Sequence, residues 1–420
     1  MRKTLLTLVT LLALGGLFAG SWFVTGMLRG GEIAPDTPAT TIAADAVDGV
    51  IASGSTQPTG AVSAAEAGDL VFPLPRNLAD LDRTLPLLMG RFGANSVAAT
   101  RVFTYASIAW HDTANPAGAA TFIAPSAAGQ GSEQGMLAAG AVIVELLDNE
   151  QVADLVEAWE GDLSNESAAV VSSVVAFADA DGYDATADVT APSYEGPLAW
   201  KAGGYRDGTP VGYEPGYGQV KTVKLDLAMC PVAPAPRTAI EAERATLDGV
   251  DRDIAAPVVA RPERFALLSY LYINANLPES QKLQMSRIGQ TSTVMLHDAL
   301  IATWRANWEN GIASPIDLFA DGDTLVTSSY PSYPSWTEVA VAATETYVKG
   351  ILQKDVTVEE MVDFISGRSG IDTNYAGLLG ELTDDIANAR SSTHHWNADR
   401  DAGAKLGTCI AGESLKLLGK

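Results

Sequence analysis

The chain has 420 residues, of which 47% are hydrophobic and 19% charged, and this composition excludes a disordered or fibrous protein. Acidic residues outnumber basic ones by 51 to 27, which gives a formal net charge of −24. A surface this negative repels nucleic acid and anionic lipid, and it suits a domain in a salty or extracytoplasmic setting.

Residues 1–29 are expected to direct the chain out of the cytoplasm. An uncharged stretch runs from residue 4 to 28, between Lys3 and Arg29. Its length is near the roughly 20 residues that span a bilayer, and it exceeds the apolar region of about 7–15 residues in a cleaved signal peptide. We therefore expect an uncleaved membrane anchor. A cleaved signal peptide is the alternative, because the small residues at 19–21 suit a cleavage site.

The remaining chain divides into a linker and one domain. Residues 30–68 are rich in Ala, Thr, Gly, Asp, Ser and Pro, as in a flexible linker, and residues 69–420 are expected to fold. Inside the domain, residues 183–235 are dominated by Gly, Tyr and Pro and predict a long irregular insertion. For Cys230 and Cys409, an extracytoplasmic disulfide and two buried thiols are equal alternatives.

The rest of the domain predicts helices, because apolar residues recur at spacings of three and four between cap residues, Gly and Pro. The expected helices cover residues 96–114, 135–147, 152–159, 168–178, 236–247, 262–275, 278–308, 335–352, 358–365, 375–389 and 401–418. No strand-rich region or internal repeat is evident. We therefore predict an all-α protein, a helical bundle with long irregular loops.

A first chemistry-bearing segment reads Pro331-Ser332-Tyr333-Pro334-Ser335 and then opens a helix. Ser335 suits the N-cap position, and the free N–H groups of the first turn favour an anion. Trp336 and Thr337 follow it. The same residues also fit an ordinary helix start, with Glu338 at capping-box spacing from Ser335.

A second segment, residues 389–403, contains Arg390, His395 and Asp399. The four-residue spacing of His395 and Asp399 stacks the two side chains in a helical turn, where the aspartate can orient the imidazole. The adjacent His394 competes for the same role. A surface or capping role is the commoner fate of a histidine pair.

Both segments resemble the oxyanion-binding motifs of the vanadium-dependent haloperoxidases and the type 2 phosphatidic acid phosphatases. In that family the first motif reads P-S-x-P-S-G-H, so Trp336 and Thr337 replace its Gly and His. The second motif has Arg, His and Asp in that order. Arg390 is one residue closer to His395 than in the usual pattern.

Two further segments are similar to the same family. A Lys ends a helix there and an Arg-Pro pair follows after six residues, whereas this chain has Asn307 and Ser314 at that spacing. Residues 98–115 are similar to an early helix of bacterial haloperoxidase-like proteins. Otherwise, His111 and Asp112 are ordinary polar residues at a helix C-terminus.

This resemblance covers about residues 80–420 and implies the haloperoxidase helical bundle. It implies that Ser335 and Arg390 bind an oxyanion, that His395 and Asp399 are catalytic, and that His395 ligates vanadate if the site is functional. The missing Lys, Arg and acid–base His argue against tight vanadate binding. Charge-assisted hydrogen bonds contribute about 1.5–3 kcal/mol each, so two lost cations remove on the order of 3–6 kcal/mol of anion affinity.

We therefore expect an extracytoplasmic haloperoxidase- or phosphatase-like protein, membrane-anchored or secreted, with a degraded oxyanion site. One alternative is an inactive, membrane-tethered binding or structural protein. Another is a phosphoester hydrolase whose site is rebuilt by cations of the insertion, such as Arg206 or Lys221. If it is active, the resemblance implies a vanadium haloperoxidase-like peroxidase or an acid phosphatase-like hydrolase that acts on a small-molecule or oxyanion ligand.

Overall fold

The computed structural model describes residues 96–117, 119–147, 162–186, 188–201, 214–247, 261–319, 330–368, 373–390 and 394–419. The expected anchor, linker and helix 152–159 lie outside these ranges. The described residues are mostly helical and contain no β-strand, only an isolated bridge between Ala199 and Ile312. The prediction of an all-α fold is confirmed. None of the described helices is long and apolar enough to cross a bilayer.

The main helices are α4 (Ser96–Ala114), α5 (Gly131–Leu147), α7 (Asn165–Asp179), α8 (Arg237–Arg244), α9 (Pro262–Asn276), α10 (Met285–Asn310), α11 (Pro315–Phe319), α12 (Trp336–Leu352), α13 (Val358–Ser366), α14 (Thr373–Ala389) and α15 (Asn397–Lys416). Short 3-10 turns are η2 (Asp184–Thr186), η3 (Tyr217–Gln219), η4 (Leu227–Met229) and η5 (Glu279–Gln284).

Most expected helices agree with these bounds to within about one turn, but three details differ. The expected helix 278–308 begins as the 3-10 turn η5 and becomes α-helical only at Met285. The expected helix 401–418 already begins at Asn397, and α11 was not expected. The earlier start of α15 matters most, because it brings Asp399 into the first turn of the helix.

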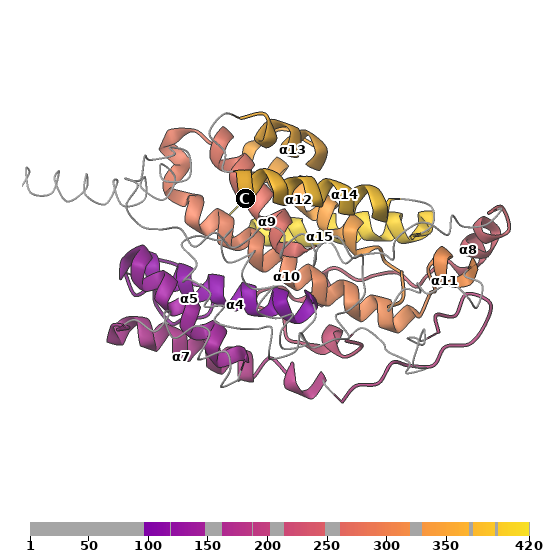
Figure 1. Ribbon diagram of the computed structural model, residues 1–420, viewed down its shortest axis with the longest axis horizontal. Coiled ribbons are helices and arrows are strands. Elements are labelled where there is room, and N and C mark those ends of the chain that lie inside the picture. Colours follow the sequence, from indigo (N-terminus) through magenta and orange to yellow (C-terminus); the bar gives the residue numbers. More distant parts are fainter. Residues whose placement is uncertain are drawn as a thin grey trace, which may run out of the picture.

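The helices form two groups that meet along α10 (Figure 1). Helices α4, α5 and α7 pack on one another as the first group. Helices α9, α12, α13, α14 and α15 make up the second, and α8 and α11 lie at the end of the molecule where α10 finishes. A large apolar core, with Trp304 and Trp336 fully buried, fills the second group.

Helices α12 and α15 approach closely because glycines line the face of α15 that meets α12. A Cβ atom on Gly407 would lie 2.2 Å from the carbonyl oxygen of Val339, and one on Gly403 would lie 2.6 Å from that of Ser335. Any larger residue would push the helices apart. The two glycines therefore fix the N-terminal turn of α12 against the first turns of α15.

Two buried aspartates hold loops onto the helices in the same way. Asp112 on α4 accepts hydrogen bonds from the backbone N–H groups of residues 122–124 at 3.0–3.2 Å. Asp298 on α10 accepts them from residues 223–225 at 2.8–3.0 Å. The reading of Asp112 as an ordinary helix-end residue is thus corrected: its carboxylate satisfies three loop donors that would otherwise be buried without acceptors.

A disulfide joins Cys230 to Cys409, with the Cα atoms 5.7 Å apart and the two positions separated by 179 in the sequence. It ties the end of the 183–235 insertion to α15. Closing a loop of this length stabilises the fold by on the order of 4–5 kcal/mol, because it lowers the entropy of the unfolded chain. Of the two alternatives left open for the cysteines, the structure has the disulfide.

Replacing Asp298 with Ala is expected to lower the free energy of unfolding by about 3 kcal/mol or more, because three buried N–H groups lose their acceptor. Denaturant unfolding of the purified domain measures the loss. Asp226→Ala is the matched control, since Asp226 accepts a single 3.0 Å bond from Ala228 in an exposed turn. That change should cost less than about 1 kcal/mol. Equal losses in the two variants would contradict the proposed anchoring role.

Candidate functional site

The two motif segments identified in the sequence, around Ser335 and around His395, meet where α12 and α15 begin. The backbone N–H of Ser335 donates to the carbonyl oxygen of Asp399 at 3.0 Å. The indole N–H of Trp396 donates to the carbonyl oxygen of Ala313 at 2.8 Å, which brings in the loop after α10. The structure therefore places the Pro-Ser turn, the His-Asp segment and the end of α10 in one buried cluster.

His395 lies just before α15, and Asp399 lies in its first turn. Oδ2 of Asp399 accepts a hydrogen bond from the backbone N–H of Trp396 at 3.2 Å and lies 3.7 Å from Nδ1 of His395. Both side chains are almost fully buried. The two side chains therefore lie close together, but the carboxylate hydrogen-bonds to the start of the helix and approaches the imidazole at a distance longer than a hydrogen bond.

The neighbouring His394 is completely buried, and neither ring nitrogen has a hydrogen-bond partner among the described residues. Burial, followed by the nearby charge of His395, lowers the pKa of His394 to about 4. His394 is therefore neutral near pH 7. It contributes no positive charge to an anion there.

Arg390 is held by two carboxylates. Its Nε lies 2.8 Å from one oxygen of Glu338, its Nη2 lies 3.5 Å from the other, and its Nη1 donates to Glu359. Burial alone lowers the pKa of Arg390, but the bonds and charges of Glu338 and Glu359 outweigh burial and raise that pKa above its ordinary value. The guanidinium of Arg390 is charged, and its N–H groups donate to Glu338 and Glu359 of the same chain.

Ser335 is the N-cap of α12, as expected, but the capping box is only half formed. Its hydroxyl oxygen accepts a long bond of 3.5 Å from the backbone N–H of Glu338. The backbone N–H of Ser335 is already bonded to Asp399, so the Glu338 side chain turns to Arg390 instead. The sequence identified Glu338 only as a capping residue and missed its ion pair.

The four substituted positions supply no cation. Asn307 is fully buried, and within the described part of the chain neither its Nδ2 nor its Oδ1 has a hydrogen-bond partner. The hydroxyl of Ser314 donates to Asp317 at 2.7 Å. Trp336 and Thr337 are 1% and 3% exposed, so the indole fills space where the family motif has Gly.

Of the two insertion cations named as candidates for a rebuilt site, the structure describes Lys221 alone. The Nζ atom of Lys221 lies 4.8 Å from the ring centroid of Phe177 on α7, in the first helix group. The guanidinium of Arg305 donates to the carbonyl oxygen of Gly218 at 2.8 Å. Arg206 lies outside the described residues. Lys221, one example given for the rebuilt-site alternative, therefore packs against α7.

These residues do not fit vanadate or another multiply charged oxyanion. Such a group requires several cations or free donors around its oxygens. The positions that the motifs assign contain one cation, Arg390, already bonded to Glu338 and Glu359, and Asp399 adds a further carboxylate. Among the described residues there is also no cluster of three or more His, Cys, Asp or Glu side chains that could hold a metal ion.

The other two histidines have structural surroundings. His111 lies 2.9 Å from Asp112 and His297 lies 3.3 Å from Asp298, each through Nδ1. Both aspartates are the loop anchors described above. These pairs therefore belong to the packing of the helices.

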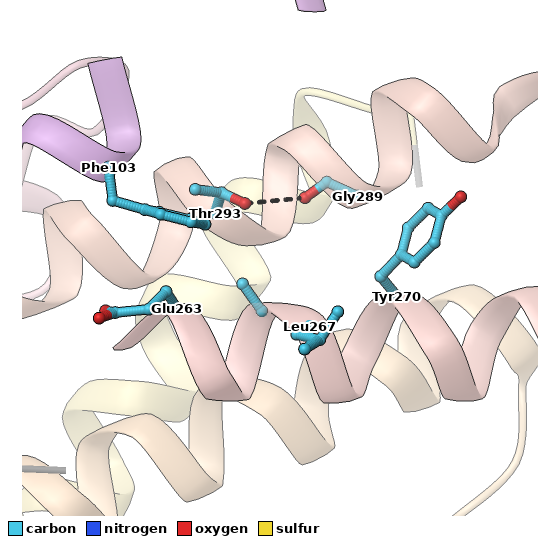
Figure 2. Close-up of a pocket in the computed structure, with 7 residues that line it drawn as sticks. Phe103, Glu263, Leu267, Tyr270, Gly289 and Thr293 are labelled. Carbon is cyan, nitrogen blue, oxygen red and sulfur yellow. Dashed lines mark hydrogen bonds between the residues drawn. The ribbon is translucent and has the colours of Figure 1, made fainter. Parts of the chain in front are cut away.

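A small pocket lies between α4, α9 and α10, lined by Phe103, Glu263, Ala266, Leu267, Tyr270, Gly289 and Thr293 (Figure 2). Its volume is about 20 Å³, roughly the room that one water molecule needs. Glu263 is engaged by Thr100 at 3.4 Å and by Arg261 at 2.7 Å. This pocket is too small and too acidic to hold an oxyanion.

No protein-family model and no curated protein matches the sequence. Among solved structures, the chain is similar to a bacterial vanadium-dependent iodoperoxidase, with a TM-score of 0.54 and 15% identity, over 82% of this chain and 97% of that one. It is also similar to a bacterial vanadium-dependent chloroperoxidase in its holo form, with a TM-score of 0.46 and 13% identity, over 88% of this chain and 97% of that one. The likeness to the iodoperoxidase confirms the prediction of a vanadium haloperoxidase-type fold.

The buried, neutral His394 makes stability depend on pH. Between its ordinary pKa of 6.5 and its folded pKa of about 4, the unfolded chain takes up a proton that the folded chain does not. Stability is therefore lost as the pH falls through this window and levels off below it. Relative to His394→Asn, the wild type should lose on the order of 2–3 kcal/mol between these limits. Denaturant unfolding of both proteins at several pH values measures the difference, and parallel pH profiles would contradict it.

Proposed function

We propose that this chain is a vanadium haloperoxidase-fold protein of the extracytoplasmic space that has lost vanadate-dependent chemistry and acts as a binding or structural protein. The observation that carries the proposal is the pairing of Arg390 with Glu338 and Glu359. Arg390, the cation expected to bind an oxyanion, is already neutralised by carboxylates of the same chain.

The electrostatic balance supports this proposal. An oxyanion bound at Arg390 would have to displace Glu338 or lie beside it. A like charge about 4 Å away costs on the order of 4 kcal/mol near a protein surface. This cost adds to the affinity lost with the two cations that Asn307 and Ser314 replace. Both effects act in the same direction, against tight binding of vanadate or a phosphoryl group.

The available acid–base groups support it as well. Thr337, in place of the family's histidine, exchanges no proton near neutral pH. His394 is neutral, but both of its ring nitrogens are buried without partners. Lys221, the candidate cation for a rebuilt phosphoester hydrolase, lies against Phe177 on α7. No described residue favours the hydrolase alternative over loss of oxyanion chemistry.

The proposed location rests on two independent features. The uncharged segment at residues 4–28 is long enough to anchor the chain in a membrane with the folded domain outside. The disulfide between Cys230 and Cys409 is typical of an oxidising compartment. The surplus of acidic residues suits a domain exposed to such a medium.

Purified full-length chain incubated with vanadate, peroxide and iodide or bromide should oxidise no halide above the rate of free vanadate. It should also hydrolyse no phosphoester, since Asn307 and Ser314 replace two cations of the family's motifs and Thr337 replaces its acid–base histidine. The bacterial iodoperoxidase with the same fold is the positive control under identical conditions. Turnover that rises with vanadate and disappears in His395→Ala would refute the proposal.

Fractionation of producing cells should place the chain in the membrane or outside the cytoplasm, with no free thiol. Labelling with a thiol reagent before and after reduction measures the latter, and Cys230→Ser/Cys409→Ser is the unlabelled control. Recovery from the cytoplasm with two reactive thiols would contradict the proposed location.

A further inference from the structure

We propose that the carboxylate of Glu338 is an internal replacement for the oxyanion, bound by Arg390 at the N-terminus of α12, so that removing its charge restores an oxyanion-binding site. This inference rests on the proposed loss of vanadate-dependent chemistry. It names the group in the chain that stands where an anion would bind.

The geometry of the pair is the first support. Nε and Nη2 of Arg390 lie 2.8 and 3.5 Å from the two different oxygens of Glu338, which is the two-pronged contact that a guanidinium makes with an oxyanion. The two residues are 52 positions apart, on α12 and just beyond α14. The pair therefore arises from tertiary packing and does not come from neighbours on one helix.

The surroundings of Glu338 are the second support. It is the third residue of α12, where the helix dipole favours negative charge. Its backbone N–H faces the hydroxyl of Ser335, the residue that the Pro-Ser motif assigns to oxyanion binding. Gly403 holds this turn against α15, because a Cβ there would come within 3.1 Å of Cβ of Glu338. Glu338 thus lies in the field that would otherwise attract a bound anion.

Burial separates the roles of the two acids. The side chain of Glu338 is 13% exposed, whereas that of Glu359 is 46% exposed. A buried carboxylate is screened less by water and competes more strongly for the guanidinium. Glu359 therefore acts as an outer partner, and Glu338 is the acid whose removal frees the inner face of Arg390.

The ligand class follows from the charge that remains. Without Glu338, the site would offer the Arg390 guanidinium, the Ser335 hydroxyl and the positive end of the α12 dipole. Such a set suits a tetrahedral oxyanion of low charge, with inorganic phosphate as the simplest probe. With Asn307 and Ser314 in place of two cations, we expect weak binding even when the site is freed.

The experiment measures phosphate binding to the full-length chain by calorimetry. Glu338→Gln keeps the shape of the side chain and removes its charge, so the association constant for phosphate should rise about tenfold or more over the wild type. Glu338→Gln/Glu359→Gln should bind more tightly still. Adding Arg390→Gln to Glu338→Gln should return binding to the wild-type value.

Asp355→Asn is the matched control, because it removes one acid from an exposed ion pair with Lys349 and leaves Arg390 untouched. It should leave phosphate binding unchanged. A gain in this control equal to that of Glu338→Gln would mean a general effect of net charge and would overturn the inference.

A folded Glu338→Gln that binds phosphate no better than the wild type would likewise overturn it, since Glu338 would then only fasten the end of α14. If Glu338→Gln does not fold, Glu338→Ala tests the same point, because it also removes the negative charge beside Arg390, and a rise in binding is expected there too. Halide oxidation by the wild type would instead refute the proposed function. The two failures are therefore distinguishable.

Discussion

The close contact between α12 and α15 is the constraint on which the site depends. Gly403 and Gly407 let the two backbones approach, and the N–H of Ser335 then reaches the carbonyl of Asp399 at 3.0 Å. This contact sets the Pro-Ser turn beside the His-Asp segment. With larger residues at the two glycines, the helices would separate and the candidate site would have no common location.

The same helical fold accommodates different charges at this site in the family and in this chain. In the family that the motifs resemble, cations at this end of the bundle face an oxyanion. Here Arg390 faces Glu338 and Glu359, while the buried Asn307 occupies the position of a second cation. Helix packing does not require the original charges, because it depends on shape and apolar burial. Fold and activity are therefore separable in this chain.

Stability rests on interactions away from this site. Asp112 on α4 and Asp298 on α10 each satisfy three consecutive backbone donors of a loop. The disulfide between Cys230 and Cys409 adds a covalent tie between the insertion and α15. Since these anchors lie outside the candidate site, the motif residues could change their chemistry without loss of the fold.

The sequence alone determined most helices, the N-cap at Ser335 and the order of the motifs, because periodicity and capping are local properties of the chain. It could not decide which acid binds Arg390 or whether the cysteines pair. The tertiary structure decided these, because each depends on residues far apart in the chain. Glu338 and Arg390, for example, are separated by 52 positions and meet only after α12 and α14 have packed into the bundle.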